Sequence, residues 1–416
     1  MSDYLPQEVI SEIFLRLPVK SLVIFTSVCK SWGSIIKSLS FIQAHLSHRI
    51  SFNDLHDTHL LLLHGVSLIS YRSDFGLEDS FYGLKREVYS LHYDNLAFTE
   101  YCKIAFHHIP IADRKMSNEC FRVVGICNGL IFLADDISHS GYKFIIWNPV
   151  IRKLVALPKP GLTFETHGRY NACHGFAFDA STNDFAVRLS KFGFVGDTAN
   201  QTFVEVYSLA SGSWSEPKLV DIDPLCAINR CSPQAFVNPL RWDARSLSLT
   251  SISYRCFILA FDVSRELFQE IMMPKSLDLN SHRVLKFQSS VSADRKSLAM
   301  FITNPNVEED LHLDIWEMKE YAVQESWTKL ITLRPQGPLQ SLPKALCFRK
   351  SGDVVLVIYH GPQQHYRRKE KRIELVSLDL GSGDLKNLGS SKYHYYTMDP
   401  YEESTVLLDR NDAVSY

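Results

Sequence analysis

The clearest structural signal in this chain is a set of five similar stretches: FIIWNPVIRKLVALPKP (144–160), VEVYSLASGSWSEPK (204–218), FILAFDVSRELFQEIMMP (257–274), LDIWEMKEYAVQESWTKL (313–330) and IELVSLDLGSGDLKNLG (373–389). Each one begins with an aliphatic strand, continues through a polar turn and enters a second strand. The residues taken as equivalent are Asn148, Ser208, Asp262, Glu317 and Asp379. A weaker sixth copy lies at 88–91, so the copies recur about every 58 residues.

A repeat of this length with several strands in each copy is typical of a β-propeller. The chain has 416 residues, which predicts about six such units after a short N-terminal segment. Nine strands are predicted from alternating or continuous apolar runs between turn residues. They are Phe121–Ile126, Leu130–Ala134, Phe144–Trp147, Val204–Leu209, Phe257–Phe261, Leu298–Ile302, Leu313–Trp316, Val354–Tyr359 and Ile373–Leu378.

Composition and charge exclude several classes of protein. Hydrophobic residues make up 45% and charged residues 22% of the chain, which excludes a mostly disordered protein. Forty-four Lys and Arg against 46 Asp and Glu give a net charge of −2, which argues against broad electrostatic binding of nucleic acid. We find no secretory signal and no run long enough to span a membrane. The nine cysteines are scattered, and we expect them to be reduced.

The N-terminal segment follows a helical period instead. In LPQEVISEIFLRL (5–17), Leu5, Val9, Ile13 and Leu17 recur every fourth residue, which predicts a first helix ended by Pro18. A short second helix is expected from Ser21 and a third over Ser31–Leu39. We expect a helical unit at 1–46 and the β-repeat at 47–416. A unit this small rarely holds its own core, and its surplus apolar surface implies burial against another surface.

The two parts together resemble a plant-type F-box protein with an F-box-associated, kelch-like repeat region. The stretch LPQEVISEIFLRLPVKSLVIFTSVCKSWGSII (5–36) follows the F-box pattern, and CNGLIFL (127–133) and HGFAFDASTNDFAV (174–187) resemble recurrent phrases of the repeat region. The resemblance covers nearly the whole chain. It implies a small α-helical N-terminal F-box followed by an all-β propeller of about six blades.

The resemblance also implies which residues would contact a Skp-type adaptor. Carried over by position, they are Leu5, Pro6, Ile10, Ile13, Leu17, Pro18, Leu22, Val28, Cys29, Lys30, Trp32 and Ile36. Some of these side chains, Trp32 and Val28 above all, could instead pack inside the helical unit. Two positions depart from the family pattern: Ile24 stands where Arg is frequent, and Gly33 where a larger polar residue is usual. Gly33 is expected to weaken the third helix by about 0.5–1 kcal/mol relative to Ala.

The function implied by the resemblance is that of a substrate receptor in a ubiquitin ligase of the Skp-cullin-F-box type. The helices would dock on the adaptor and through it on a cullin scaffold, and the propeller would hold a protein substrate for ubiquitination and proteasomal degradation. The expected location is the cytoplasm, the nucleus or both. No cofactor, metal, nucleic acid or membrane partner is expected, and the protein is expected to be a non-catalytic subunit. Substrate specificity is expected in rim loops such as 159–171, 190–201 and 303–312.

Other interpretations stay open. LHYDNLAF (91–98) resembles pollen S-locus relatives, which suggests recognition of a ribonuclease in self-incompatibility; a non-degradative adaptor-binding protein is a further possibility. A propeller enzyme is more remote, because the sequence contains no P-loop, HExxH or GxSxG motif, and Cys226 and Cys231 lack a second pair for zinc. The basic run HYRRKEKR (365–372) is interpreted as a solvated hairpin loop, with a nuclear-import signal or a patch for an acidic partner as the alternative.

Overall fold

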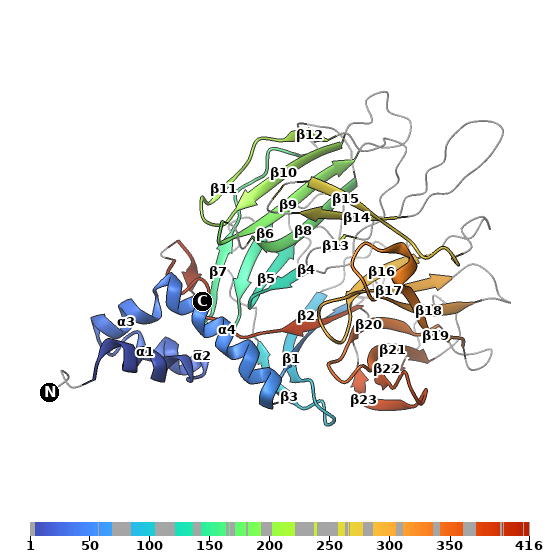
Figure 1. The fold of residues 1–416 in the computed structure, drawn as a ribbon, viewed down its shortest axis with the longest axis horizontal. Helices are drawn as coiled ribbons and strands as arrows, with labels where there is room; N and C mark the ends of the chain where they lie inside the picture. Colours follow the sequence, from blue (N-terminus) through green and yellow to red (C-terminus); the bar gives the residue numbers. More distant parts are fainter. Residues whose placement is uncertain are drawn as a thin grey trace, which may run out of the picture. The chain divides into compact units, whose positions relative to one another are not determined.

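The computed structural model has four helices at its N-terminus and β-strands throughout the rest (Figure 1). The structure describes residues 5–56, 58–68, 85–104, 121–135, 143–163, 166, 171–179, 182–192, 202–220, 237–238, 257–262, 265, 267–277, 286–304, 311–335, 342–360, 372–391, 393, 395–410 and 412–415. The helices are α1 (Gln7–Leu15), α2 (Val19–Phe25), α3 (Lys30–Ile36) and α4 (Leu39–His56).

Among the described residues the strands form six sheets, in agreement with the predicted number of about six. Sheet A contains, in spatial order, β24 (Tyr395–Tyr401), β1 (Leu60–Leu68), β2 (Lys85–Tyr93) and β3 (Glu100–Ile104). Sheet B contains β25 (Val414–Ser415), β7 (Lys153–Ala156), β6 (Phe144–Asn148), β5 (Leu130–Ala134) and β4 (Arg122–Cys127). Sheet C contains β11 (Ser213–Trp214), β10 (Thr202–Ser208), β9 (Asp184–Phe192) and β8 (Asn171–Asp179), with β12 (Lys218–Val220) also paired to β10.

The remaining sheets follow the same order along the chain. Sheet D contains β13 (Val237–Asn238), β14 (Phe257–Asp262) and β15 (Leu267–Met272). Sheet E contains β16 (Lys286–Val291), β17 (Leu298–Asn304), β18 (His312–Met318) and β19 (Trp327–Leu333). Sheet F contains β20 (Lys344–Phe348), β21 (Val354–His360), β22 (Arg372–Leu378) and β23 (Leu385–Ser391). Successive antiparallel sheets of this kind make an all-β propeller, as the repeat predicts.

All nine predicted strands are present, and the five similar stretches are the hairpins formed by the last strands of sheets B to F. The turn in these hairpins is polar for a physical reason. In four of the five hairpins, a side-chain oxygen at the end of the first strand accepts a backbone N–H of the turn, which fixes the chain reversal. The bonds are Asn148 with Val150 (3.2 Å), Ser208 with Ser211 (3.1 Å), Asp262 with Arg265 (3.0 Å) and Asp379 with Gly381 (2.7 Å).

One of the residues taken as equivalent is displaced by two positions. Ser208 pairs with Ala186 and donates a hydrogen bond to Asp184, at the start of β9. In sheet F it is Ser377 that occupies this place, because it pairs with Val355 and donates to Asp353 (3.0 Å). The structural equivalent of Ser208 is therefore Ser377, not Asp379.

The chain splits into two compact units. The first comprises residues 1–64, 87–158 and 399–416, and the second residues 65–86 and 159–398. In the first unit, buried residues of sheets A and B form one cluster that includes Tyr89, Trp147 and Tyr401. In the second unit, one cluster lies between sheets D and E and another between sheets E and F. Sheets A and B, D and E, and E and F thus bury faces against one another, as expected for units that cannot fold singly.

The helical part is longer than predicted. The third helix ends at Ile36, and a fourth helix that the sequence analysis did not predict follows from Leu39 to His56. This helix runs without interruption through residue 46, the predicted end of the helical unit. Helix α1 begins at Gln7 with Pro6 as its N-cap, which agrees with the preference of proline for the start of a helix.

Candidate functional site

Aromatic packing around Phe14 holds the four helices together. The Phe14 side chain is 2% exposed, and its ring centroid lies 5.8 Å from that of Phe25, 5.1 Å from Trp32 and 6.4 Å from Phe41. One residue from each helix thus meets at a single point. Edge-to-face and tilted ring contacts at these distances stabilise such a cluster beyond the area that they bury.

The outer face of α1 is apolar although its inner face already fills the core. Val9 is 41% and Ile13 44% exposed, and Leu5, which precedes the helix, is 55% exposed. Val9 and Ile13 are four residues apart, so they lie in one row along α1. The row therefore forms an apolar stripe that no described part of the chain covers, and its position next to a complete core favours contact with a partner.

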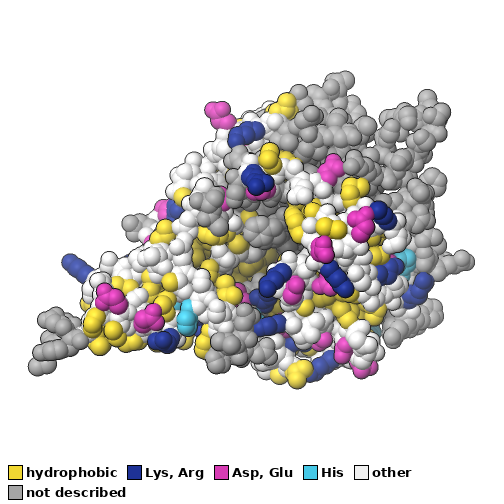
Figure 2. All heavy atoms as spheres, viewed as in Figure 1, with side chains coloured by type: hydrophobic (Ala, Val, Ile, Leu, Met, Phe, Trp, Pro, Cys, Tyr) yellow, Lys and Arg dark blue, Asp and Glu magenta, His cyan; other side chains and the backbone are white. Residues whose placement is uncertain are grey.

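Three further side chains, in α2, in the turn after it and in α4, are also apolar and exposed. Ile24 is 64% and Val28 58% exposed, again four residues apart, and Leu39 at the start of α4 is 54% exposed. Figure 2 shows hydrophobic side chains on the surface of the N-terminal helices, interspersed with acidic ones. We call Leu5, Val9, Ile13, Ile24, Val28 and Leu39 the apolar helical surface.

The structure divides the residues predicted to contact the adaptor into three groups. The exposed ones are Leu5, Pro6, Ile13, Pro18, Val28, Cys29 and Lys30. The partly buried ones are Ile10, Leu17 and Trp32. Leu22 and Ile36 are 0% exposed and belong to the core of the helices, so in this conformation they are not accessible to a partner. Their inward direction could not be read from the motif, because several apolar rows run along these short helices.

The sequence analysis missed Val9, Ile24 and Leu39 as surface residues. Val9 could have been found, because it lies in the same row as Leu5 and Ile13. Ile24 was recognised as a departure from the family pattern, and its 64% exposure now makes it the most open apolar side chain of the helices. Leu39 belongs to a helix that was not predicted.

Gly33 has a role that the sequence analysis judged wrongly. A Cβ atom on Gly33 would lie 2.9 Å from the backbone oxygen of Thr26, closer than a carbon atom can approach without movement of the backbone. The residue therefore permits α3 to pack closely against the end of α2. Gly33 lowers the helix propensity of α3, but only a residue without a Cβ atom allows this close contact. Replacement by Ala is therefore not expected to stabilise the helix here.

Cys29 adds a chemically distinct group between α2 and α3. It is exposed, and its Sγ lies 3.2 Å from Ser31 Oγ. The hydrogen bond with Ser31, together with the backbone N–H of Trp32, lowers the pKa of the Cys29 thiol. A lowered pKa increases the thiolate fraction near neutral pH, so alkylation of Cys29 provides a chemical probe of this surface.

In the second unit, the described part of one predicted rim loop is held by a buried carboxylate. Glu205 of β10 is 1% exposed, and its two oxygens accept the backbone N–H groups of Gly161 (2.7 Å) and Leu162 (2.9 Å). Thr163 and Thr166 then hydrogen-bond to one another across the next turn (3.0 Å). The first part of the 159–171 loop thus has a defined conformation on sheet C.

The stretch 91–98 has a structural explanation. Leu91 and Phe98 are buried, and the ring of His92 stacks on Phe98 at 4.5 Å. Asn95 Oδ1 accepts the backbone N–H of Phe98 at 3.0 Å, which forms the turn between β2 and β3. The likeness to S-locus relatives therefore involves residues that build a hairpin.

Several other predictions fall where the structure gives no description. Cys226, Cys231 and most of the loops 190–201 and 303–312 lie outside the described residues, as does the basic run except for Arg372 at the start of β22. Within the described ranges, no three His, Cys, Asp or Glu side chains are grouped as metal ligands. No helix among the described residues has the length and hydropathy needed to cross a membrane.

Comparison with known families agrees with these observations. Residues 3–43 match the F-box domain, and residues 83–390 match the F-box associated beta propeller domain. An F-box/kelch-repeat protein of Arabidopsis thaliana is 27% identical over 79% of this chain and 79% of its own length. Another F-box protein of Arabidopsis thaliana is 26% identical over 93% of this chain and 87% of its own length.

Solved structures are similar only at a distance. A putative 6-phosphogluconolactonase from Bacteroides fragilis is 10% identical, with a TM-score of 0.37 over 83% of this chain and 98% of that one. This likeness carries no argument about activity. The family matches and the apolar helical surface lead to one assignment: the chain belongs to the F-box proteins that carry an F-box-associated β-propeller domain.

Proposed function

We propose that the protein is the substrate-recognition subunit of a Skp-cullin-F-box ubiquitin ligase in the cytoplasm, the nucleus or both. The apolar helical surface docks on a Skp-type adaptor, which connects the protein to the cullin scaffold. The propeller binds a protein substrate and presents it for ubiquitination and degradation. In this proposal the chain has no catalytic residue of its own, because the ligase machinery transfers the ubiquitin.

The observation that carries the proposal is the exposure of Leu5, just before α1, and of Val9 and Ile13 on α1, whose Phe14 is buried in the core. Complete burial of one aliphatic side chain contributes about 1.5–3 kcal/mol. A few such anchors in the middle of an interface dominate its binding energy. The stripe therefore has enough apolar surface to hold an adaptor, even though polar and charged side chains surround it.

The test is capture of a recombinant Skp-type adaptor by the full chain and by the double variant Val9→Asp/Ile13→Asp. Both side chains point to solvent, so the substitutions leave the Phe14 cluster intact. We expect adaptor affinity to fall by at least about 100-fold, since two carboxylates would be buried without partners. The matched control is Leu96→Asp, which changes a 74% exposed leucine of the β2–β3 turn.

The control should bind the adaptor as tightly as the unmodified chain. Unchanged adaptor binding by the double variant, with a circular dichroism spectrum like that of the unmodified chain, would refute docking through this stripe. Alkylation of Cys29 gives an independent readout, because a bound adaptor should slow the reaction of the exposed thiol.

The substrate is sought with the same variant. Proteins are captured from plant cells under proteasome inhibition, with the full chain and with Val9→Asp/Ile13→Asp side by side. Proteins retained by both are substrate candidates, and those lost with the variant belong to the ligase machinery. A retained protein whose abundance does not rise when the receptor is removed would favour the non-degradative alternative.

A further inference from the structure

The residues that follow β24 touch both the helices and the sheets of the first unit. Glu402 Oε2 accepts a hydrogen bond from Asn53 Nδ2 of α4 at 2.6 Å, and Asn53 Oδ1 in turn accepts one from Thr58 Oγ1 at 2.7 Å. The other oxygen of Glu402 lies 3.6 Å from His59 Nδ1. The carboxylate therefore connects the last turns of α4 with the segment that leads into β1.

The next residue makes a second connection to the helices. Glu403 is 5% exposed, and its Oε1 accepts a hydrogen bond from the Tyr101 hydroxyl of β3 at 3.1 Å. The ring of Tyr101 carries the ammonium of Lys20 from α2, 4.8 Å from its centroid. A cation above a tyrosine face at this distance is attracted to it. Helix α2 and sheet A thus meet at the Tyr101 side chain, whose hydroxyl group is hydrogen-bonded to Glu403.

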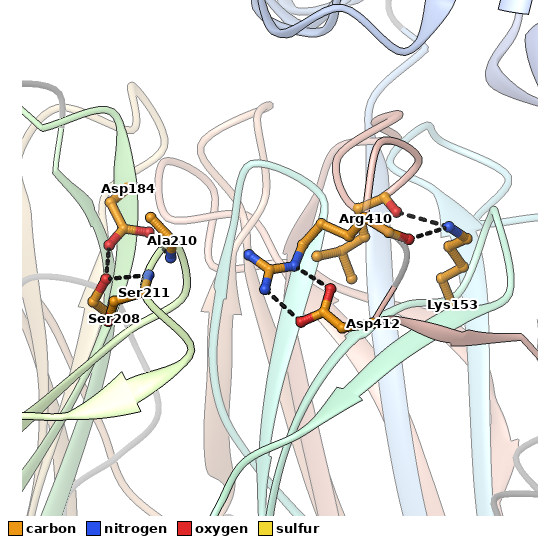
Figure 3. A network of polar contacts seen from close by, with 8 residues as sticks. Lys153, Asp184, Ser208, Ala210, Ser211, Arg410 and Asp412 are labelled. Atoms are coloured by element: carbon orange, nitrogen blue, oxygen red, sulfur yellow. Dashed lines mark hydrogen bonds and ion pairs between the residues drawn. The ribbon is translucent and has the colours of Figure 1, made fainter.

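On its other side the same segment is fastened to sheet B. Asn148 Nδ2 donates to the carbonyls of Ser404 (3.0 Å) and Val406 (2.9 Å). Lys153 Nζ donates to the carbonyls of Leu407 (3.1 Å) and Arg410 (2.8 Å), as Figure 3 shows for this lysine. Arg410 is itself paired with Asp412, at 2.8 Å between Nε and Oδ1.

The last described residues of the chain form a further strand, β25. Val414 pairs with Leu154 at the edge of sheet B. Close packing marks the start of the segment as well, because a Cβ atom on Gly129 would overlap Ser404 and would lie 2.7 Å from the backbone oxygen of Glu402. Residues 402–410 and 412–415 are thus packed closely against Asn148, Lys153 and Gly129. They lie beyond residues 83–390, the part of the chain that matches the propeller family.

We propose that residues 402–410 and 412–415 form a strap that sets the orientation of the F-box helices relative to sheets A and B. Without the strap, α4 would connect to sheet A through the short segment at 57–59. With it, Glu402 and Glu403 hold α4 and α2 while Asn148 and Lys153 hold the strap to sheet B. The functional consequence rests on the proposed function: the strap fixes the direction in which a docked adaptor points away from the substrate domain.

The test measures the orientation directly in the full chain without any partner. Spin labels are introduced by bio-orthogonal chemistry at Ser34 of α3 and Ala156 of β7, both exposed and both in the first unit. The distribution of label distances is then recorded by pulsed electron resonance. We expect a single narrow distribution for the unmodified chain, and for Glu402→Ala a distribution at least about twice as wide, since a helix released from its contact samples more orientations.

Matched variants separate orientation from folding. Glu402→Gln retains an oxygen that can accept from Asn53 and should restore the narrow distribution. Lys153→Met keeps the length of the side chain but removes the ammonium from the strap carbonyls, and it should widen the distribution as Glu402→Ala does. If Glu402→Ala fails to fold, Lys153→Met still decides the question. Narrow distributions in both variants would overturn the proposal.

Adaptor capture is measured on the same samples. The strap variants leave the apolar helical surface unchanged, so they should bind the adaptor like the unmodified chain. A wide distribution with normal adaptor binding supports the strap. If the strap variants give a wide distribution and no form of the chain, including the unmodified one, binds the adaptor, the strap is supported and the proposed function is refuted. The strap and the proposed function can therefore fail separately.

Discussion

At the scale of single residues, Gly33 gives a prediction that separates packing from helix propensity. Replacement by Ala should favour the helix by about 0.5–1 kcal/mol on propensity alone. The added Cβ would however lie 2.9 Å from the Thr26 backbone oxygen, and overpacking of this kind typically costs about 1–3 kcal/mol. We therefore expect Gly33→Ala to lower the free energy of unfolding, measured by urea denaturation.

The neighbouring Ser34 is the control for this prediction. It is exposed on the same helix, so Ser34→Ala changes propensity without a close contact. A stability of Gly33→Ala equal to or above that of the unmodified chain would show that α2 and α3 separate at no cost.

The direction of individual side chains marks the limit of prediction from sequence at this scale. The four-residue spacing correctly placed Val9 and Ile13 in one row, but nothing in that spacing says whether the row faces the core or the solvent. Leu22 and Ile36 were carried over from the family pattern as adaptor contacts and are fully buried. The choice is made by the Phe14 cluster, which needs four helices to exist, and one of these helices was unknown.

At the scale of secondary structure elements, strands with a dense apolar pattern were predictable and α4 was not. The nine predicted strands carry continuous or alternating apolar residues between turn signals, and β5 spans the predicted residues Leu130–Ala134. Helix α4 contains LSFIQAHLSHRISFNDLH, in which Ile42, Leu46 and Ile50 keep a four-residue spacing while serines and histidines are scattered among the other apolar residues. Its position depends on polar contacts such as that of Asn53 with Glu402, which join residues far apart in the chain.

A buried histidine connects α4 to the end of α1 and makes this junction sensitive to pH. His45 is 0% exposed, and its Nε2 donates to the carbonyl oxygen of Leu17 at 2.9 Å. Burial lowers the pKa of His45 from 6.5 to about 4. Between these two values the unfolded chain binds a proton that the folded chain does not bind, so stability is present above about pH 6.5 and is lost as the pH falls.

The variant His45→Gln tests this junction. Glutamine can still donate to the Leu17 carbonyl but does not titrate. Urea midpoints measured at about pH 7.5 and about pH 5 should show a smaller loss on acidification for the variant than for the unmodified chain. Equal losses in both proteins would mean that His45 does not control the pH dependence of this junction.

At the scale of the whole molecule, the number of sheets followed from the repeat, while the way sheet A is completed did not. In sheets B to F the described strands come from consecutive parts of the chain, except for the short β25 in sheet B. Sheet A instead combines β1 to β3 with β24, which lies near the other end of the chain. The sequence of β24, YYTMDPY, contains a proline, and its apolar alternation extends only over Tyr396–Asp399. The pairing of β24 with β1 joins the two ends of the repeat region. A local sequence pattern cannot predict a contact between residues so far apart in the chain.

This arrangement predicts that the last segment can be removed and returned as a separate peptide. Tyr396, Met398 and Tyr401 of β24 are at most 1% exposed, and loss of three such side chains removes at least about 5 kcal/mol of burial energy, comparable with the stability of a whole domain. A chain that ends at Ser391 should therefore lose its cooperative thermal transition. A synthetic peptide of residues 392–416 should restore the transition in proportion to its concentration, because binding to the folded state alone stabilises it.

The same peptide with Met398→Asp places a charge in the core and should not restore the transition. An unchanged melting curve for the shortened chain would show that sheet A is stable with three strands and that β24 is not needed to complete the propeller.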